Sequence, residues 1–180
     1  MRVISGVVRG KKLKALEGLD TRPTSDRVKE AIFSIIQFDL PEASVLDLFG
    51  GSGQLGIEAL SRGAKKVTFV DSSKAACDII TENLKLTGFL DMAKVVNISS
   101  DDFLKSTKGG FDIVFLDPPY KKAIIESTLP LLGRSMNIGG IIICEHEAGL
   151  ELPEKAGQLS LVKKYKYGRI SLTRYIVGEE

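Results

Sequence analysis

From residue 44 onward, short apolar segments alternate with helical ones, and this alternation constrains the fold more than any other feature. The predicted strands are Ser44–Phe49, Lys66–Val70, Ala93–Ile98, Phe111–Leu116 and Gly140–Cys144, and the predicted helices are Leu55–Leu60, Ser72–Leu86 and Lys121–Leu132. This βαβα order predicts a mainly parallel sheet with helices on both faces. Near the end, Leu159–Lys166 and Arg169–Val177 flank Tyr167-Gly168, which indicates an antiparallel hairpin closing the sheet edge.

The first 40 residues follow a different pattern. Residues 2–13 are rich in β-branched side chains and interrupted by glycine, which predicts a small β-hairpin with basic flanks. Helix-capping residues in 22–26 precede an apolar face made of Val28, Ala31, Ile32, Ile35 and Ile36. We predict a single domain over residues 1–180, in which residues 1–20 form an N-terminal hairpin extension.

Composition narrows the class of protein. No apolar run approaches the roughly 20 residues of a membrane helix, and the basic start lacks the apolar region of a signal peptide. Two distant cysteines make no disulfide framework or zinc spacing, so we expect a cytoplasmic protein without a metal site. Positive charge gathers at the two ends: residues 1–29 and 159–177 each carry a net +5, although the whole chain carries only +2. Basic termini are common and are often merely solvated; the alternative interpretation is a phosphate-binding surface built from the two ends of the chain.

A glycine-rich turn follows the first strand of the alternating region. In Asp47-Leu48-Phe49-Gly50-Gly51-Ser52-Gly53-Gln54-Leu55-Gly56, the glycines let the backbone approach a cofactor closely. Asp71 ends the next strand, where a carboxylate can accept both hydroxyls of an adenosine ribose. The spacing Gly51-x-Gly53-x-x-Gly56 also matches the fingerprint for dinucleotides, so NAD is an alternative cofactor. Asp47 disfavours a diphosphate at this place and favours the cationic S-adenosylmethionine.

The motif Asp117-Pro118-Pro119-Tyr120 follows the fourth strand of that region. Proline lacks the N–H of a sheet ladder, so the strand ends here in a rigid, extended segment. The carboxylate of Asp117 and the carbonyl of Pro118 offer two acceptors to the amino group of a nucleobase, and Tyr120 offers a face for stacking. The motif therefore predicts methyl transfer to an exocyclic amino group, driven mainly by proximity and orientation.

The motifs together resemble a known family. Asp117–Tyr120 with Phe49–Gly53 is similar to the class I amino-methyltransferases, and residues 2–13, 22–33 and 55–63 are similar to the RsmD family. This resemblance runs nearly end to end and implies a Rossmann-like fold with a seven-stranded sheet, S-adenosylmethionine as cofactor, and guanine N2 of 16S ribosomal RNA as target. It also implies that the N-terminal extension binds RNA, and that the target base leaves its stack.

The predicted site residues fall into three groups. The catalytic group is Asp117, Pro118, Pro119 and Tyr120. The cofactor-binding group is Asp47, Phe49, Gly51, Ser52, Gly53, Asp71, Ser72, Ser100 and Asp101, of which either Ser100 or Asp101 faces the adenine. The RNA-binding group is Arg2, Arg9, Lys11, Lys12, Arg22 and Arg27.

Several alternatives stay open at this point. A DNA methyltransferase acting on adenine N6 or cytosine N4 would use the same Asp-Pro-Pro-Tyr motif, but a chain of 180 residues leaves little room for a segment that reads DNA sequence. An RNA-binding assembly factor without turnover and an NAD-dependent oxidoreductase are further alternatives. His146, between two glutamates, is a candidate for lining the base pocket. We expect a monomer whose partner is the small ribosomal subunit.

Overall fold

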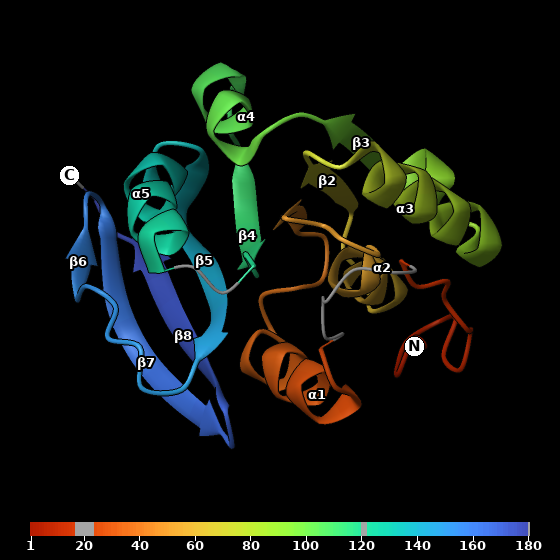
Figure 1. The fold of residues 1–180 in the computed structure, drawn as a ribbon, viewed down its shortest axis with the longest axis horizontal. Helices are drawn as coiled ribbons and strands as arrows, with labels where there is room; N and C mark the ends of the chain where they lie inside the picture. The colour runs from red at the N-terminus through yellow and green to blue at the C-terminus, as the bar shows by residue number, and fades with distance from the viewer. Residues whose placement is uncertain (17–23, 120–121, 180) are drawn as a thin grey trace.

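The computed structural model describes residues 1–16, 24–119 and 122–179, which form helical layers on both sides of an eight-stranded sheet (Figure 1). The described helices are α1 (Asp26–Ile35), α2 (Gln54–Ser61), α3 (Lys74–Thr87), α4 (Ser100–Ser106) and α5 (Lys122–Gly133), with a 3-10 helix η1 (Leu90–Met92). The strands are β1 (Ser44–Leu48), β2 (Lys66–Asp71), β3 (Ala93–Asn97), β4 (Phe111–Leu116), β5 (Met136–Glu147), β6 (Lys155–Ala156), β7 (Leu159–Tyr167) and β8 (Ile170–Val177).

The strands lie in the order β3-β2-β1-β4-β5-β8-β7-β6. The first five run parallel, whereas β8, β7 and β6 each pair antiparallel with their neighbour, so the predicted mainly parallel sheet with a C-terminal hairpin is confirmed. The prediction of seven strands was wrong by one. Lys155–Ala156 adds the two-residue strand β6 beyond β7, and a pair this short leaves no periodic pattern in a sequence.

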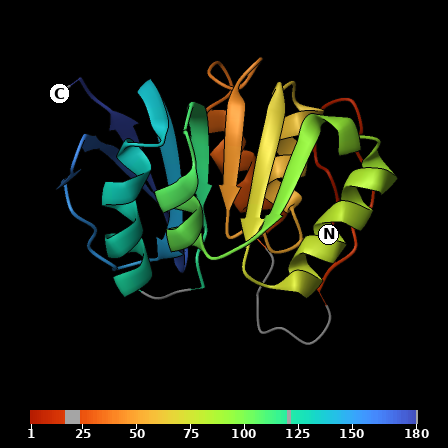
Figure 2. The same ribbon diagram turned by 90° about the horizontal axis from the view of Figure 1, so that it is seen from above.

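The helices divide between the two faces of the sheet (Figure 2). Buried side chains of α1, α2 and α3 belong to one apolar core, and those of α4 and α5 belong to the other. Successive residues of β4 alternate between these cores: Ile113 and Phe115 join the first, and Val114 and Leu116 join the second. Burial on both faces explains why the parallel strands read as continuous apolar runs. None of the helices in the described ranges is long and apolar enough to cross a membrane.

Helix α1 begins where its capping residue predicts. The hydroxyl of Ser25 accepts a hydrogen bond from the backbone N–H of Val28 at 3.3 Å, which satisfies one free donor of the first turn. Val28, Ile32 and Ile36 are buried as expected, but so is Lys29, which is fully inaccessible to solvent. A buried lysine on an otherwise apolar face requires a partner, and that partner lies on α2.

The N-terminal segment, residues 2–13, is a loop closed by one antiparallel bridge between Arg2 and Lys12, so the predicted hairpin is reduced to a single pair. Its backbone is fixed to α2 instead. The N–H groups of Ile4 and Ser5 donate to the carboxylate of Glu58 at 2.8 and 2.9 Å. Gly6 lies so close to α2 that a Cβ atom there would be 1.8 Å from the carbonyl oxygen of Ser61. We call residues 2–13 the N-terminal loop.

Candidate active site

Four acidic side chains gather where β1, β2, β4 and β5 end. They are Asp47 in β1, Asp71 at the end of β2, Asp117 directly after β4, and Glu145 near the end of β5. The strands are parallel and in register, with Leu48 opposite Leu116 and Leu116 opposite Cys144, so the four acids lie at one edge of the sheet. We call this place the carboxyl edge. Ligands of open α/β sheets bind at such an edge.

The glycine turn between β1 and α2 has three residues in the left-handed region. They are Phe49 (φ +73°), Gly51 (φ +56°) and Gly53 (φ +77°). Glycine adopts this conformation freely, but a phenylalanine there stores strain, and such strain is typical of functional turns. The carboxylate of Asp71 accepts hydrogen bonds from the backbone N–H of Gly51 at 2.9 Å and of Ser73 at 2.8 Å. Asp71 therefore ties the turn to the end of β2.

Two residues hold α2 close to the sheet: Gly56 in its first turn, and Asp47, which is also a predicted cofactor-binding residue. A Cβ atom on Gly56 would lie 2.2 Å from the ring of Phe69, so this glycine allows the helix to pack directly on β2. The buried carboxyl of Asp47 accepts a hydrogen bond from the N–H of Gly56 at 2.9 Å. Burial, together with the charges of Asp117 and Asp71, raises the pKa of Asp47 to about 8. Asp47 therefore anchors the first turn of α2 in a largely uncharged form at neutral pH.

The residues around the turn fit S-adenosylmethionine. Asp71 is half-buried, and a carboxylate that accepts two backbone hydrogen bonds still has lone pairs for ribose hydroxyls. Gln54, the first residue of α2, is buried, and its Oε1 has no hydrogen-bond partner among the described residues. A buried acceptor without a donor is costly and suits the ammonium group of this cofactor. Gln54 has no predicted role in the motif, because glutamine in a glycine turn carries no sequence signal of its own.

The motif after β4 has the geometry expected of a strand end. Asp117 is half-buried, Pro118 is buried and Pro119 is exposed, whereas Tyr120 lies outside the described residues. Burial raises the pKa of Asp117 to about 6, and a hydrogen bond with Thr24 opposes the rise. At neutral pH Asp117 is therefore mostly ionised and can accept hydrogen bonds.

Glu145 is a residue of this edge that the sequence analysis mentioned only as a neighbour of His146. It is 4% exposed, and its Oε2 accepts a hydrogen bond from the hydroxyl of Thr24 at 3.2 Å. Burial and the charge of Asp117 raise the pKa of Glu145 to about 8. The sequence did contain a signal, since Glu145 directly follows the apolar segment Gly140–Cys144, which is predicted as a strand.

The predicted adenine contacts lie at the start of α4, a helix that the sequence analysis did not predict. Ser99 caps this helix: its hydroxyl accepts from the N–H of Asp102 at 3.2 Å and donates to the side chain of the same residue at 2.7 Å. Ser100 is half-buried in the first turn and Asp101 is exposed. Ser72 is exposed in the loop between β2 and α3. Helix α4 follows β3, so its amino end lies on the carboxyl edge.

The predicted RNA-binding cations that the structure describes are all exposed: Arg2, Arg9, Lys11, Lys12 and Arg27. Arg22 lies outside the described residues. Arg2 pairs with Asp26 of α1 at 3.2 Å, so part of its charge is compensated. The side chain of Met1 contacts the hydroxyl of Ser52 at 3.3 Å, which brings the start of the N-terminal loop to the glycine turn.

His146 lies on the other face of β5 from Glu145 and is 2% exposed. Its Nε2 hydrogen bonds the hydroxyl of Thr173 at 2.8 Å, and its Nδ1 lies 3.0 Å from the carbonyl oxygen of Glu147. Burial lowers the pKa of His146, so the ring is neutral at pH 7. The expectation that it lines the base pocket was wrong, because the alternation of side chains along β5 points the ring of His146 to the face of the sheet that α4 and α5 cover.

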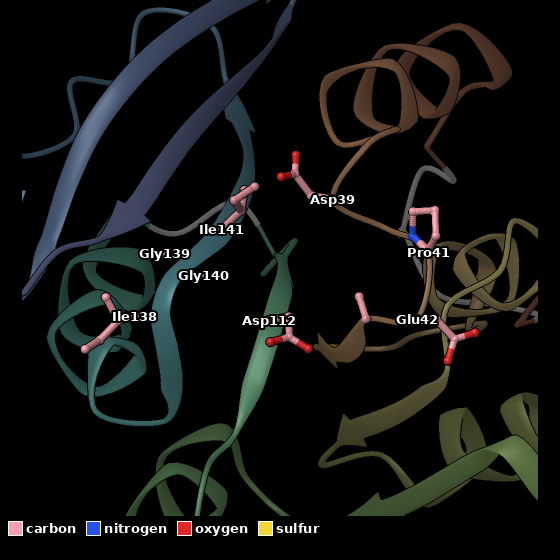
Figure 3. A pocket seen from close by; sticks show the side chains of 9 residues that line it. Asp39, Pro41, Glu42, Asp112, Ile138, Gly139, Gly140 and Ile141 are labelled. Carbon is pink, nitrogen blue, oxygen red and sulfur yellow. The ribbon is translucent and has the colours of Figure 1, made fainter.

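A hollow lies at the edge of the sheet opposite the carboxyl edge, where β1 and β4 begin (Figure 3). Its volume is about 250 Å³, and the carboxylates of Asp39, Glu42 and Asp112 line it together with Pro41 and residues 138–141. Asp112 is already engaged, because it accepts hydrogen bonds from the N–H of Ser44 at 2.8 Å and the amide of Asn137 at 2.7 Å. The negative charge of the side chains that line this hollow does not suit the binding of a nucleic-acid backbone.

The parallel sheet, the glycine turn and the acid at the end of β2 define a class I methyltransferase that uses S-adenosylmethionine. Residues 1–176 match the family described as conserved hypothetical protein 95. The chain belongs to this family, the RsmD family of methyltransferases.

Relatives and solved structures agree with this assignment. Ribosomal RNA small subunit methyltransferase D of Haemophilus influenzae is 44% identical over 135 residues, which are 73% of this chain and 70% of the relative. The Escherichia coli protein of the same name is 34% identical over 177 residues, covering 97% and 89%. The solved structure of E. coli yhhF has a TM-score of 0.88 at 35% identity, covering 100% and 99%. An RNA methyltransferase from Salinibacter ruber, solved with S-adenosyl-L-homocysteine, shares the fold at 16% identity and a TM-score of 0.70, covering 88% and 95%.

Proposed function

We propose that this enzyme methylates the exocyclic N2 of a guanine in the 16S ribosomal RNA of the small subunit, as a cytoplasmic monomer. The observation that carries the proposal is the half-buried Asp117 at the carboxyl edge, directly after β4 and beside the strand that leads into the glycine turn. The names of the two relatives above, both small-subunit rRNA methyltransferases, support the choice of RNA. A DNA substrate is not favoured.

The residues of the chain do the work of binding and orientation. The bound cofactor supplies an electrophilic methyl group carried on a positively charged sulfur. The Asp117 carboxylate and the Pro118 carbonyl accept the two hydrogens of the target amino group and so direct its lone pair at that methyl group, while Tyr120 stacks on the base. The bound cofactor would give up this methyl group to the nitrogen and would keep the electron pair of the former carbon–sulfur bond. The amine then loses one proton, which Asp117 accepts before releasing it to solvent.

Two exposed basic regions would hold the RNA backbone. One is the N-terminal loop with Arg9, Lys11 and Lys12. The other is the β7–β8 hairpin, where Lys163 lies over the ring of Tyr165 at 5.0 Å and Tyr167 pairs with Ile170 beside the carboxyl edge. Cations next to aromatic rings bind phosphates and unstacked bases without reading much sequence.

Transfer of labelled methyl groups tests this proposal. Small subunits that lack their native modification, naked 16S rRNA and duplex DNA are incubated with the enzyme and labelled S-adenosylmethionine, and the modified nucleoside is identified by mass. We expect N2-methylguanosine in the ribosomal samples only. Asp117→Ala should abolish transfer but retain cofactor binding, whereas Asp91→Ala, which removes an exposed carboxylate of η1, should retain both. Methylated adenine or cytosine in DNA would refute the proposal.

A further inference from the structure

Glu145 is a buried acid for which the mechanism above has no role. Ile113, Phe115 and Asp117 point to one face at the end of β4, and Ile141, Ile143 and Glu145 point to the same face of β5. Because Leu116 is paired with Cys144, Asp117 and Glu145 are neighbours across two adjacent strands. Asp117 is the more exposed of the two acids, since it is half-buried, whereas Glu145 is only 4% exposed.

Thr24 lies beside both carboxyls. It is 7% exposed, and its hydroxyl donates to Glu145 Oε2 at 3.2 Å. Hydrogen bonding by the same hydroxyl lowers the pKa of both acids and so opposes the effect of burial. Thr24 directly precedes Ser25, the cap of α1, so the position of α1 determines where this hydroxyl lies.

We propose that Glu145 and Thr24 are positioning residues for methyl transfer: they hold the Asp117 carboxylate in the orientation that accepts the target amino group, with Glu145 keeping one proton within the pair. This inference rests on the function proposed above and names how its acceptor is kept in place. Two carboxyls this close do not both ionise readily, so the buried member retains a proton and the more exposed member is the anion.

The surroundings of the pair support this division. From β1, the carboxyl of Asp47 lies near enough for the charge of Asp117 to raise its pKa, and on the other face of β5 both acids raise the pKa of the Cys144 thiol. From β8, Leu172 lies opposite Glu145. Among the described residues no cation contributes to the pKa of either acid. Burial and the charge of Asp117 raise the pKa of Glu145, so a proton retained on Glu145 would limit the repulsion between the two carboxyls.

The test compares Glu145→Gln, Glu145→Ala and Thr24→Val with Glu147→Gln, which changes an exposed acid at the end of the same strand. Single-turnover rates on small subunits are measured from pH 5 to 9.5, beside the dissociation constant for S-adenosylmethionine.

Wild type should give a bell-shaped profile with limbs near pH 6 and pH 8. Glu145→Gln should lose at most about threefold at pH 7 and keep the acid limb, while the alkaline limb is weakened to the part that Asp47, whose pKa is also about 8, contributes. Glu145→Ala should lose about tenfold or more, and Thr24→Val several-fold, with unchanged cofactor affinity, because a displaced acceptor lowers the rate of an orientation-dependent reaction.

A second measurement separates this inference from the proposed function. The carboxyl carbons of Asp117 and Glu145 are titrated by NMR in the protein without RNA. Two coupled steps, near pH 6 and pH 8, should appear in wild type, and only the lower step in Glu145→Gln. Ionisation of both carboxyls below pH 5, or rates in Glu145→Ala equal to those of Glu147→Gln, would overturn the inference. If wild type methylates no ribosomal RNA, the proposed function fails, and the titration alone decides whether the pair shares a proton.

Discussion

Glu58 connects the N-terminal loop to the body of the enzyme, and its removal should be unusually costly. This glutamate has no solvent exposure. Its carboxylate accepts from the N–H groups of Ile4 and Ser5 at 2.8 and 2.9 Å, from Lys29 Nζ at 3.4 Å and from Arg62 Nε at 2.9 Å. Glu58→Ala would therefore leave one buried cation without its counter-ion and two backbone donors without an acceptor.

The magnitude follows from burial. Breaking a buried ion pair by removing one partner costs about 3–5 kcal/mol. The two freed N–H groups add little if the N-terminal loop detaches and water reaches them, so we expect a loss of about 3–5 kcal/mol in unfolding free energy. For a chain of this length, each kcal/mol lowers Tm by about 2–4 °C, which gives a decrease of roughly 6–20 °C.

Glu82→Ala is the matched control, since Glu82 also joins the N-terminal region to a helix. Its pair with Lys14 spans 2.8 Å but is about half exposed, with 56% and 49% side-chain exposure. An exposed pair of this kind contributes about 0–1 kcal/mol. Urea denaturation followed by circular dichroism measures both variants, and amide exchange at Ile4 and Ser5 reports detachment of the loop. If Glu58→Ala costs no more than Glu82→Ala, the buried network does not hold the loop.

Three further outcomes follow from the same structure. Gly56→Ala should lower the unfolding free energy by about 1–3 kcal/mol because the new Cβ lies 2.2 Å from an aromatic ring of β2, whereas Gly133→Ala in α5, with its nearest neighbour at 3.5 Å, should be neutral or stabilising in the same denaturation experiment. Asp47 binds a proton more tightly in the folded protein than in the unfolded chain, so its stabilising contribution is present below about pH 4 and is lost as pH rises to about 8. In urea denaturation over this pH range, the unfolding free energy of Asp47→Asn should therefore decline less than that of the wild type. Arg9→Ala combined with Lys11→Ala should weaken RNA binding and reduce its salt dependence in a titration at several salt concentrations, and an unchanged slope would limit these side chains to a structural role.

Much of the architecture could be predicted because parallel strands buried on both faces leave an unambiguous pattern. Strands β1, β2 and β4 began and ended within one residue of their predicted bounds. Strand β5 was predicted as Gly140–Cys144 but runs over Met136–Glu147, because pairing with β8 extends its end into polar residues that carry no strand signal. Helix α4 was missed since its seven residues are too few for a clear helical period.

The motifs of the candidate site could be read from the sequence, but the buried side chains that contact them in the structure could not. A motif names Asp117, because proline fixes the backbone on either side of it. Glu145, Thr24 and Glu58 gain their roles only from tertiary contacts with residues 28 to 121 positions away. No local pattern indicates that a glutamate on a helix is completely buried, and charged residues usually lie on the surface.

Strand β8 lies between β5 and β7, although it is the last described strand along the chain. A growing chain therefore cannot complete its sheet before Val177 has been synthesised, roughly 30 residues after β5 ends at Glu147. At about 5–20 residues per second, the free edge of β5 stays unpaired for about 2–6 seconds. During that interval a long apolar strand is open to pairing with other chains. Translation speed over this last segment thus bears directly on how much of the newly made enzyme avoids aggregation.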